Sequence, residues 1–231
     1  MKTIKKYKVG GCVRDQIIGR PSKDIDYVVE ATSFDEMVEV IKDEWAGEIF
    51  LSRPEYLTVR AKVNNEVCDF VLARKDGSYY DGRRPESVEP GTIYDDLARR
   101  DFTMNAIAFD EESKSYIDPH DGISHINRKI ICCVGRPEDR FAEDALRILR
   151  AIRFSITLEF SFSDSLYKFL YDRREFIHGN IMGSVSKERI REELLKCFRA
   201  DTIKTLRILR DLNLLLLFSE DMWLEPTLKG R

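Results

Sequence analysis

The stretch YKVGGCVRDQIIGRPSKDIDYVV, residues 7–29, decides the fold of the first half of the chain. It begins as a short strand, turns at Gly10-Gly11, has helical character over 12–18 and ends in a second apolar strand over 25–29. Strands that alternate with short helices in this way must bury their apolar faces against one another. We therefore expect an α+β fold in which helices flank a mixed β-sheet.

Start signals and turn residues place further elements after this stretch. Ser33-Phe34-Asp35-Glu36 has the form of a capping box and predicts a helix over 34–44. Asn64-Asn65 separates two runs of β-forming residues and predicts a hairpin. Residues 75–91 are rich in Gly, Pro, Asp and Arg and predict a long mobile loop. The segments with strand character are 56–63, 66–72, 106–109 and 130–134.

After Gly135 the pattern changes from strands to helices. Apolar residues recur at helical spacing in four segments, which are 141–154, 163–171, 187–199 and 202–212. We place a domain boundary near Gly135-Arg136-Pro137. Residues 1–135 then form the mixed domain and residues 136–231 an all-α domain.

Composition narrows the class of protein. The chain has 231 residues, of which 43% are hydrophobic and 34% are charged, as in an ordinary globular protein. Its longest apolar run, 212–218, is far shorter than the roughly 20 residues of a membrane span, so we expect no membrane partner. The five cysteines form no Cys-x-x-Cys pair, and no signal peptide is visible. We therefore expect a reducing compartment and a cytoplasmic location.

A pair of carboxylates marks the start of the second strand. Asp24 and Asp26 are two residues apart, so on a strand their side chains point to the same face. Such carboxylates repel each other unless a cation neutralises them. Mg²⁺ binds through one or two carboxylates together with substrate phosphates, which makes Asp24 and Asp26 candidate metal ligands. A solvated strand end is the alternative for this short motif taken alone.

Two further features favour a site for a nucleoside triphosphate. The turn at Gly10-Gly11 enters a helix, so its backbone N–H groups can face an anion, and Arg14 adds a donor suited to phosphate. Asp69 is a lone carboxylate in an otherwise apolar strand, where burial without a partner is unfavourable. If its strand neighbours that of Asp24, Asp69 completes a cup of three catalytic carboxylates.

These residues resemble the head domain of class II tRNA nucleotidyltransferases, the CCA-adding enzymes, which share their catalytic core with bacterial poly(A) polymerases. Four motifs carry the resemblance in the family's order. They are Gly10-Gly11-Cys12-Val13-Arg14-Asp15 with Asp24-Ile25-Asp26, Arg99-Arg100-Asp101-Phe102-Thr103-Met104-Asn105-Ala106, Asp118-Pro119-His120-Asp121-Gly122, and Glu143-Asp144-Ala145-Leu146-Arg147 with its continuation to Phe154. Asp81-Gly82-Arg83-Arg84-Pro85 is similar to the family's flexible loop.

The resemblance implies roles for individual residues. Arg100 is a donor in the nucleotide site, and Asp101 and Asn105 organise its turn. Asp144 and Arg147 hydrogen-bond to the incoming base, which suits cytosine and adenine because both carry an exocyclic amine beside a ring acceptor. As positions i and i+3 of a helix, these two residues are also expected to be neighbours. Arg150 and Arg153 continue the row and support the nucleotide or RNA phosphates.

The resemblance also implies a function. Residues 1–135 are then a nucleotidyltransferase head and residues 136–231 a helical neck that binds nucleotide and RNA. We expect addition of CMP and AMP to the 3′ end of tRNA from CTP and ATP, with release of pyrophosphate and Mg²⁺ as cofactor. Alternatives are an A-adding or other minimal transferase that acts on a non-standard RNA, and a non-catalytic head that senses nucleotides.

RNA binding is expected to be local and modest. The net charge is −3, whereas proteins that bind nucleic acid over their whole surface are usually basic. In the family, body and tail domains hold tRNA, and we expect no counterpart of them after the neck. We therefore expect a homodimer or a partner chain in the active species, with the apolar run 212–218 as a candidate contact.

Overall fold

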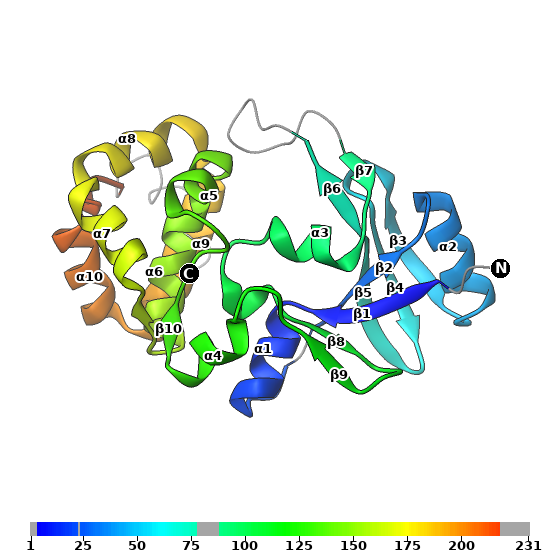
Figure 1. Ribbon diagram of the computed structural model, residues 1–231. Helices are drawn as coiled ribbons and strands as arrows, with labels where there is room; N and C mark the ends of the chain where they lie inside the picture. The colour runs from blue at the N-terminus through cyan, green and yellow to red at the C-terminus, as the bar shows by residue number, and fades with distance from the viewer. Residues whose placement is uncertain (1–3, 23, 78–87, 218–231) are drawn as a thin grey trace, which may run out of the picture. The chain divides into compact units, whose positions relative to one another are not determined.

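The computed structural model describes residues 4–22, 24–77 and 88–217 (Figure 1). These residues form two compact units, and the chain passes from the first to the second after Arg128. The boundary predicted from sequence, at residue 135, lies a few residues further along. The difference arises because β10 (Ile130–Ile131) pairs with β11 (Ser161–Phe162) and so belongs to the second unit.

A seven-stranded sheet with the strand order β3-β4-β5-β2-β1-β8-β9 forms the first unit. In that order its strands are Glu48–Arg53, Thr58–Val63, Glu66–Leu72, Ile25–Glu30, Lys5–Val9, Ala108–Asp110 and Ser115–Ile117. β2 and β5 run parallel, and the other neighbouring pairs run antiparallel. The mixed sheet expected from the sequence is confirmed.

The two faces of this sheet have different chemistry. Tyr27 of β2 and Phe70 of β5 stack with their ring centroids 5.3 Å apart, and they belong to the apolar core against which α2 (Phe34–Asp43) packs. Successive residues of a strand point to opposite faces. Asp26 and Asp69, one position before these aromatic residues, therefore lie on the face opposite α2.

Local signals start α2 and close the hairpin as expected. The Ser33 hydroxyl accepts the backbone N–H of Glu36 at 3.1 Å, while the Glu36 carboxylate accepts the backbone N–H of Thr32 at 2.6 Å. Asn64 and Asn65 both have positive φ, 51° and 66°, which asparagine tolerates better than most residues. The two-residue loop between β4 and β5 is confirmed.

The sequence missed the edge of the sheet and part of the long loop. β3 lacks a clear alternation, and its apolar residues Phe50 and Leu51 are exposed, so no periodic signal marks it. β6 (Arg74–Asp76) pairs with β7 (Val88–Pro90), so the two ends of the predicted loop form a two-stranded antiparallel sheet. Residues 78–87, including the motif at 81–85, lie outside the described residues.

Short helices complete the first unit. They are α1 (Gly11–Ile18), α3 (Ile93–Ala98), α4 (Gly122–Asn127) and the 3-10 turns Pro54–Tyr56 and Thr103–Asn105. Pro54 explains why β4 starts later than predicted, because proline favours a turn start and cannot donate to the ladder. Within the described ranges no helix is long and apolar enough to cross a membrane.

The second unit is built from six helices among the residues described. They are α5 (Pro137–Glu143), α6 (Leu146–Thr157), α7 (Asp164–Asp172), α8 (Arg174–Ser184), α9 (Lys187–Ala200) and α10 (Thr202–Asp211). α6 supplies the centre of the core, with Ile148, Leu149, Ala151 and Ile152 fully buried. The small β10–β11 pair means that the unit is mainly rather than entirely helical.

Two helix predictions in this unit are corrected. The segment 141–154 is two helices, because Asp144 is extended (φ −155°, ψ 106°) and ends α5. α8 was not predicted, because it contains Gly179 and Gly183, which lower helix propensity.

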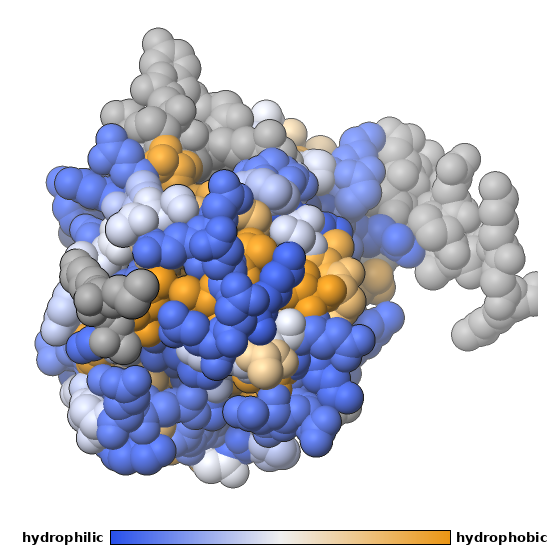
Figure 2. All heavy atoms as spheres, turned by 90° about the vertical axis from the view of Figure 1, so that its right-hand side faces the viewer, coloured by the Kyte–Doolittle hydropathy of each residue, from blue (hydrophilic) through white to orange (hydrophobic). Residues whose placement is uncertain are grey.

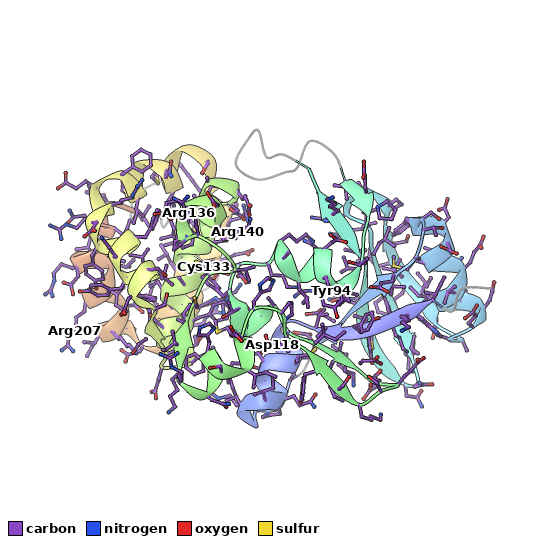
Figure 3. The ribbon with its side chains drawn as sticks, viewed as in Figure 1. Tyr94, Asp118, Cys133, Arg136, Arg140 and Arg207 are labelled. Carbon is purple, nitrogen blue, oxygen red and sulfur yellow. The ribbon has the colours of Figure 1, made fainter. Side chains whose placement is uncertain are left out.

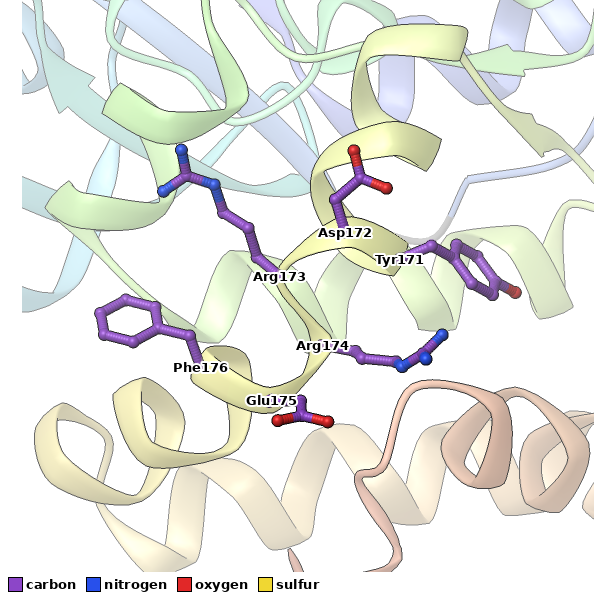
Figure 4. Close-up of a pocket in the computed structure, with 6 residues that line it drawn as sticks. All are labelled: Tyr171, Asp172, Arg173, Arg174, Glu175 and Phe176. Carbon is purple, nitrogen blue, oxygen red and sulfur yellow. The ribbon is translucent and has the colours of Figure 1, made fainter.

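The turn between α7 and α8 lines a pocket of about 440 Å³ formed by residues 171–176 (Figure 4). None of these residues is a predicted site residue.

Apolar side chains also reach the surface. On the face drawn in Figure 2, apolar atoms form patches between hydrophilic side chains. In the run 212–218, however, Leu212, Leu214 and Leu217 are buried, and the exposed leucines are Leu215 and Leu216. Most of the described leucines in this predicted dimer contact therefore pack into the core of their own unit.

Candidate functional site

Gly10 ends β1 in a backbone conformation that glycine adopts readily, with φ 75° and ψ −133°. A Cβ atom at this position would lie 3.0 Å from Nη1 of Arg100 and 3.8 Å from Oδ2 of Asp26. The turn therefore brings a backbone segment, a guanidinium group and a carboxylate into close approach. All three residues were predicted as site residues, and the fold brings them together.

Arg14 lies in α1, directly after this turn. Its Nη1 donates to Oδ1 of Asn105 at 2.8 Å, and its Nε donates to Oδ1 of Asp15 at 2.9 Å. Gly11 lies beside Arg14, since a Cβ there would meet Nη2 of Arg14 at 3.6 Å. The guanidinium group is thus held next to the turn by two different oxygens.

The turn 101–105 ties these elements together. Oδ1 of Asp101 accepts the backbone N–H of Phe102 at 2.8 Å and the side-chain amide of Asn105 at 3.1 Å. Nη1 of Arg100 donates to the backbone carbonyl of Asn105 at 3.2 Å. Asn105 therefore connects to Arg14 through its side chain and to Arg100 through its backbone.

A residue that the sequence reasoning missed anchors Arg100. Asp96 is completely buried, and its Oδ2 accepts from Nε and Nη2 of Arg100 at 3.0 and 2.8 Å, while Oδ1 accepts from Arg99. Burial by itself raises the pKa of Asp96, but the two guanidinium groups outweigh it and hold the pKa below its usual value. The i, i+4 spacing of Asp96, in α3, and Arg100, just beyond the end of α3, was the available signal.

The carboxylates gather on one face of the sheet. Asp26 and Asp69 occupy paired positions of the parallel strands β2 and β5, and the exposed Asp24 immediately precedes β2. Burial, followed by the charge of Asp69, raises the pKa of Asp26, while Arg100 and Arg60 oppose the increase. The condition set for Asp69, that its strand neighbours β2, is met.

Asp69 nevertheless has a cationic partner. Arg60, opposite it on β4, donates from Nε to Oδ1 at 2.6 Å and from Nη2 to Oδ2 at 2.5 Å. Within the described residues, no group of three or more acidic, histidine or cysteine side chains is arranged to hold a metal ion. Asp69 thus lies beside Asp26 and is engaged by Arg60, and its role in a cup of three carboxylates stays a prediction.

Asp24 and Asp26 remain as candidate metal ligands. Both supply carboxylate oxygens, the donors that Mg²⁺ prefers, and Asp26 is the more buried of the two. A Cβ at Gly10 would be in van der Waals contact with Oδ2 of Asp26, at 3.8 Å, so a cation at Asp26 would also adjoin the turn. The donor set fits a hard divalent cation that is shared with substrate oxygens.

In the second unit, Asp144 and Arg147 are neighbours through the backbone, where the N–H of Arg147 donates to the carbonyl of Asp144 at 3.1 Å, while their side chains have further partners. Asp144 accepts from Nη2 of Arg189 on α9 at 2.7 Å and from the backbone N–H of Leu146 at 3.0 Å. Arg147 donates to Oε2 of Glu143 at 2.6 Å. The break at Asp144 places it before α6 rather than on the helix that carries Arg147.

The arginines that follow on α6 form a row with an aromatic neighbour. The guanidinium groups of Arg150 and Arg153 lie 5.6 and 4.1 Å from the ring centroid of Phe154. Arg153 also donates to the buried carboxylate of Glu193 on α9 at 2.6 Å. Helix α9 thus contacts both Asp144 and Arg153.

The third motif has a structural role within the first unit. Asp118, labelled in Figure 3, accepts the backbone N–H groups of Gly122 and Ile123 at 2.7 and 2.9 Å at the start of α4. A Cβ on Gly122 would collide with the backbone carbonyl of Thr103, which requires glycine there. This close contact fixes α4 against the turn that carries Asn105.

Comparisons with known proteins agree with this geometry. The family model for the poly A polymerase head domain matches residues 6–132. The CCA-adding enzyme of Geobacillus kaustophilus is 40% identical over 193 residues, which are 82% of this chain and 44% of that protein. The CCA-adding enzyme of Listeria monocytogenes is 36% identical over 225 residues, which are 97% of this chain and 53% of that protein.

Solved structures show the same likeness. The Bacillus stearothermophilus CCA-adding enzyme in complex with CTP has a TM-score of 0.76 at 30% identity, covering 91% of this chain and 49% of that one. A tRNA nucleotidyltransferase complexed with a primer tRNA and an incoming ATP analog has a TM-score of 0.75 at 30% identity, covering 94% and 60%.

The sheet, with its glycine turn, arginines and paired aspartates, defines a nucleotidyltransferase-type head domain. The chain belongs to the poly A polymerase head domain family. It spans about half the length of the curated relatives that it matches.

Proposed function

We propose that this chain adds CMP and AMP to the 3′ end of tRNA, using CTP and ATP and releasing pyrophosphate. The observation that carries the proposal is the approach of Arg100 and Asp26 to the Gly10 turn, with Arg14 linked to the same network through Asn105. Hydrogen-bond donors that suit phosphate oxygens and a carboxylate that suits a cation thus lie together in one unit. The named relatives, all CCA-adding enzymes, support the same reaction.

In the proposed mechanism, the first unit binds the triphosphate. The guanidinium groups of Arg14 and Arg100 and the backbone N–H groups at Gly10-Gly11 hold phosphate oxygens, as such groups do at helix N-termini. Asp24 and Asp26 would hold Mg²⁺, which, when bound, supplies activation of the attacking 3′-hydroxyl and charge neutralisation at the leaving oxygen. Asp101 and Asn105 keep the arginines in position.

For the second unit, we propose that Asp144 and Arg147 contact the base. A carboxylate accepts from the exocyclic amine of cytosine or adenine, and a guanidinium group donates to the adjacent ring nitrogen. At the same edge, uracil and guanine present a carbonyl beside a ring N–H, so this arrangement would select against UTP and GTP. Arg150 and Arg153 would support the nucleotide or RNA phosphates.

The remaining partners are also proposals. Solved relatives were studied with CTP, a primer tRNA and an ATP analog, which supports nucleotide and RNA partners for this chain. The exposed Leu215 and Leu216 are the described residues of the 212–218 run that remain for a second copy or a partner chain.

One assay tests the proposal. Purified protein is incubated with Mg²⁺, a tRNA that lacks CCA, and each NTP singly and in combination, and the products are sized on a sequencing gel. We expect extension by CC with CTP alone and by CCA with CTP and ATP. Extension of only a tRNA that already ends in CC would instead identify an A-adding enzyme. Binding of NTPs without any extension would show that the chain senses nucleotides.

A further inference from the structure

Helix α3 is tied to strand β2 by the side chain of Glu30. Oε1 of Glu30, the last residue of β2, accepts the backbone N–H of Ile93, the first residue of α3, at 2.6 Å. The two residues are 63 positions apart in the sequence, so the contact joins distant segments of the first unit. The first N–H groups of a helix lack partners within the helix, and a negative charge beside them is favourable. Glu30 therefore holds the point from which α3 starts.

The other ends of β2 and α3 meet at the proposed nucleotide site. Asp26 lies four residues before Glu30 on β2, on the same face of the sheet because side chains of a strand alternate. Asp96 of α3 accepts from Nε and Nη2 of Arg100 at 3.0 and 2.8 Å. Nη1 of Arg100 would lie 3.0 Å from a Cβ at Gly10, and Oδ2 of Asp26 would lie 3.8 Å from it. The strand and the helix are thus connected at both ends.

The contact at Ile93 is close to the residue that orients Arg100. Ile93 and Asp96 are three positions apart in α3, which is about one helical turn and a rise of about 4.5 Å. Asp96 is completely buried and binds both Arg99 and Arg100. Close-packed interiors transmit small displacements instead of absorbing them. A shift of the first turn of α3 would therefore move the carboxylate that holds the guanidinium group of Arg100.

Two further contacts at the start of α3 have different effects. Thr92 and Asp95 form a reciprocal capping box, which stabilises the helix from within its own segment. The backbone N–H of Gly91 donates to the carbonyl of Ala73 at 2.8 Å, which attaches the preceding residues to the sheet. Loss of the Glu30 contact would leave both of these in place, so α3 would stay folded and attached while its direction became less well fixed.

We propose that Glu30 is a positioning residue for Arg100. Through the N–H of Ile93 it sets the start of α3, and α3, through Asp96, sets where the guanidinium group of Arg100 meets the triphosphate. The inference rests on the proposed function in one respect, which is the assignment of Arg100 to the nucleotide. Glu30 acts through α3, since along β2 it lies about 13 Å from Asp26.

The test measures equilibrium binding of CTP with Mg²⁺ to the full chain by isothermal titration calorimetry, without RNA. Glu30→Ala should raise the Kd of CTP about tenfold, since a displaced guanidinium group makes weaker hydrogen bonds to phosphate. Glu30→Gln should stay within about threefold of the unmodified protein, because its amide oxygen can still accept the N–H of Ile93. Thermal unfolding checks that each variant is folded. Glu30→Thr, too short to reach Ile93 but favoured in a strand, replaces Glu30→Ala if that variant does not fold.

Glu36→Ala is the matched control. The carboxylate of Glu36 also accepts a backbone N–H at 2.6 Å at the start of a helix, that of Thr32 before α2, and α2 carries no predicted site residue. This variant should lose thermal stability while the Kd of CTP changes by less than about twofold. An equal loss of CTP affinity in Glu36→Ala and Glu30→Ala would overturn the proposal, as would an unchanged affinity in Glu30→Ala.

A double-mutant cycle separates positioning of Arg100 from a general loss of structure. Arg100→Met removes the guanidinium group and keeps much of the volume of the side chain. In this background, Glu30→Ala should change the Kd of CTP by less than about twofold, since the group that Glu30 positions is absent. If the effects of the two substitutions are additive, Glu30 does not act through Arg100 and the proposal is wrong.

The result is separable from the fate of the proposed function. If nucleotide addition to tRNA fails while CTP binding shows the coupling of Glu30 and Arg100, the role of Glu30 stands and the proposed reaction falls. If addition succeeds and Glu30→Ala binds CTP as tightly as the unmodified protein, the role of Glu30 falls alone. Absence of CTP binding by the unmodified protein overturns the role of Glu30 together with the assignment of Arg100.

Discussion

Asp26 and Asp69 are paired across the parallel strands β2 and β5, on the sheet face opposite the aromatic core. This register places two carboxylates side by side although 43 positions separate them in the sequence. It explains why burial and a neighbouring acid together raise the pKa of Asp26. The pairing is also the basis of the first prediction.

Asp26→Asn should stabilise the metal-free protein at neutral pH. A carboxyl whose pKa is higher in the folded state binds more protons when folded, so stability falls as pH rises from the ordinary value, about 4, through the raised value. The uncharged amide of asparagine does not titrate in this range, so the variant does not lose this stability as the pH rises. Urea unfolding without metal should show a stabilisation at pH 7 that disappears below about pH 4. A variant that is less stable than the unmodified protein at pH 7 would contradict the charge argument.

Gly10→Ala should impair both stability and nucleotide binding. The new Cβ would lie 3.0 Å from Nη1 of Arg100, at a residue whose φ is +75°, so the backbone strain of about 1–3 kcal/mol is joined by displacement of the guanidinium group. Thermal unfolding and equilibrium CTP binding measure the two effects.

Gly19→Ala provides the comparison for that variant. Its φ is +81°, but no atom lies within 4 Å of the added Cβ, so only the strain is introduced. We expect a smaller loss of stability than in Gly10→Ala, because Gly19 lies in the left-handed helical region, which alanine can adopt at a cost, and we expect CTP affinity to be unchanged. Equal loss of CTP affinity in both variants would indicate that Arg100 is not involved.

Asp96→Asn should be strongly destabilising. The carboxylate is completely buried between Arg99 and Arg100, and loss of its charge leaves two guanidinium groups without their shared counterion. Breaking a buried ion pair on one side costs about 3–5 kcal/mol. In urea unfolding, the variant of its partly exposed neighbour, Asp95→Asn, should lose less than about 1 kcal/mol, because an amide oxygen at this N3 position can still accept the backbone N–H of Thr92.

Asp144→Ala should reduce the discrimination between NTP bases more than it weakens triphosphate binding. Each lost hydrogen bond to a charged group removes about 1.5–3 kcal/mol of discrimination, roughly tenfold or more in relative kcat/KM. Competition between CTP and UTP, and between ATP and GTP, in single-nucleotide addition measures it. Unchanged preference for C and A would show that the carboxylate does not read the base.

The Asp144 variant needs a structural control because Asp144 also binds Arg189. Arg189→Ala breaks the same ion pair while the Asp144 carboxylate remains. If loss of the pair alone caused the effect, both variants would blur the base preference equally. We expect the larger loss in Asp144→Ala, since that variant removes the acceptor itself.

RNA binding should be modest and only moderately sensitive to salt. Residues 136–231 hold 18 Lys and Arg against 16 Asp and Glu, and the net charge of the chain is −3. With a few phosphate contacts, the slope of log K against log salt should lie at about −3 to −5. Fluorescence anisotropy with labelled tRNA at several salt concentrations, combined with light scattering, measures affinity and oligomeric state. Low-nanomolar binding by a monomer at physiological salt would contradict this prediction.

The sequence by itself determined individual turns and helix starts and the identity of the residues with chemistry. Glycines at 10 and 11, the Asn64-Asn65 turn and the Ser33 cap act over a few residues, so their outcome could be predicted without the fold. Strand periodicity likewise placed Asp24 and Asp26 on one face.

Only the tertiary structure decided which charged groups are partners. Arg60 and Asp69 meet through strand pairing, Arg14 and Asn105 meet across the fold, and Asp144 binds Arg189 on α9. Local spacing did not predict the partner Arg189, because it lies 45 positions away in the sequence. Ion pairing depends on positions in space that a few backbone angles can change, whereas caps and turns depend on those angles alone.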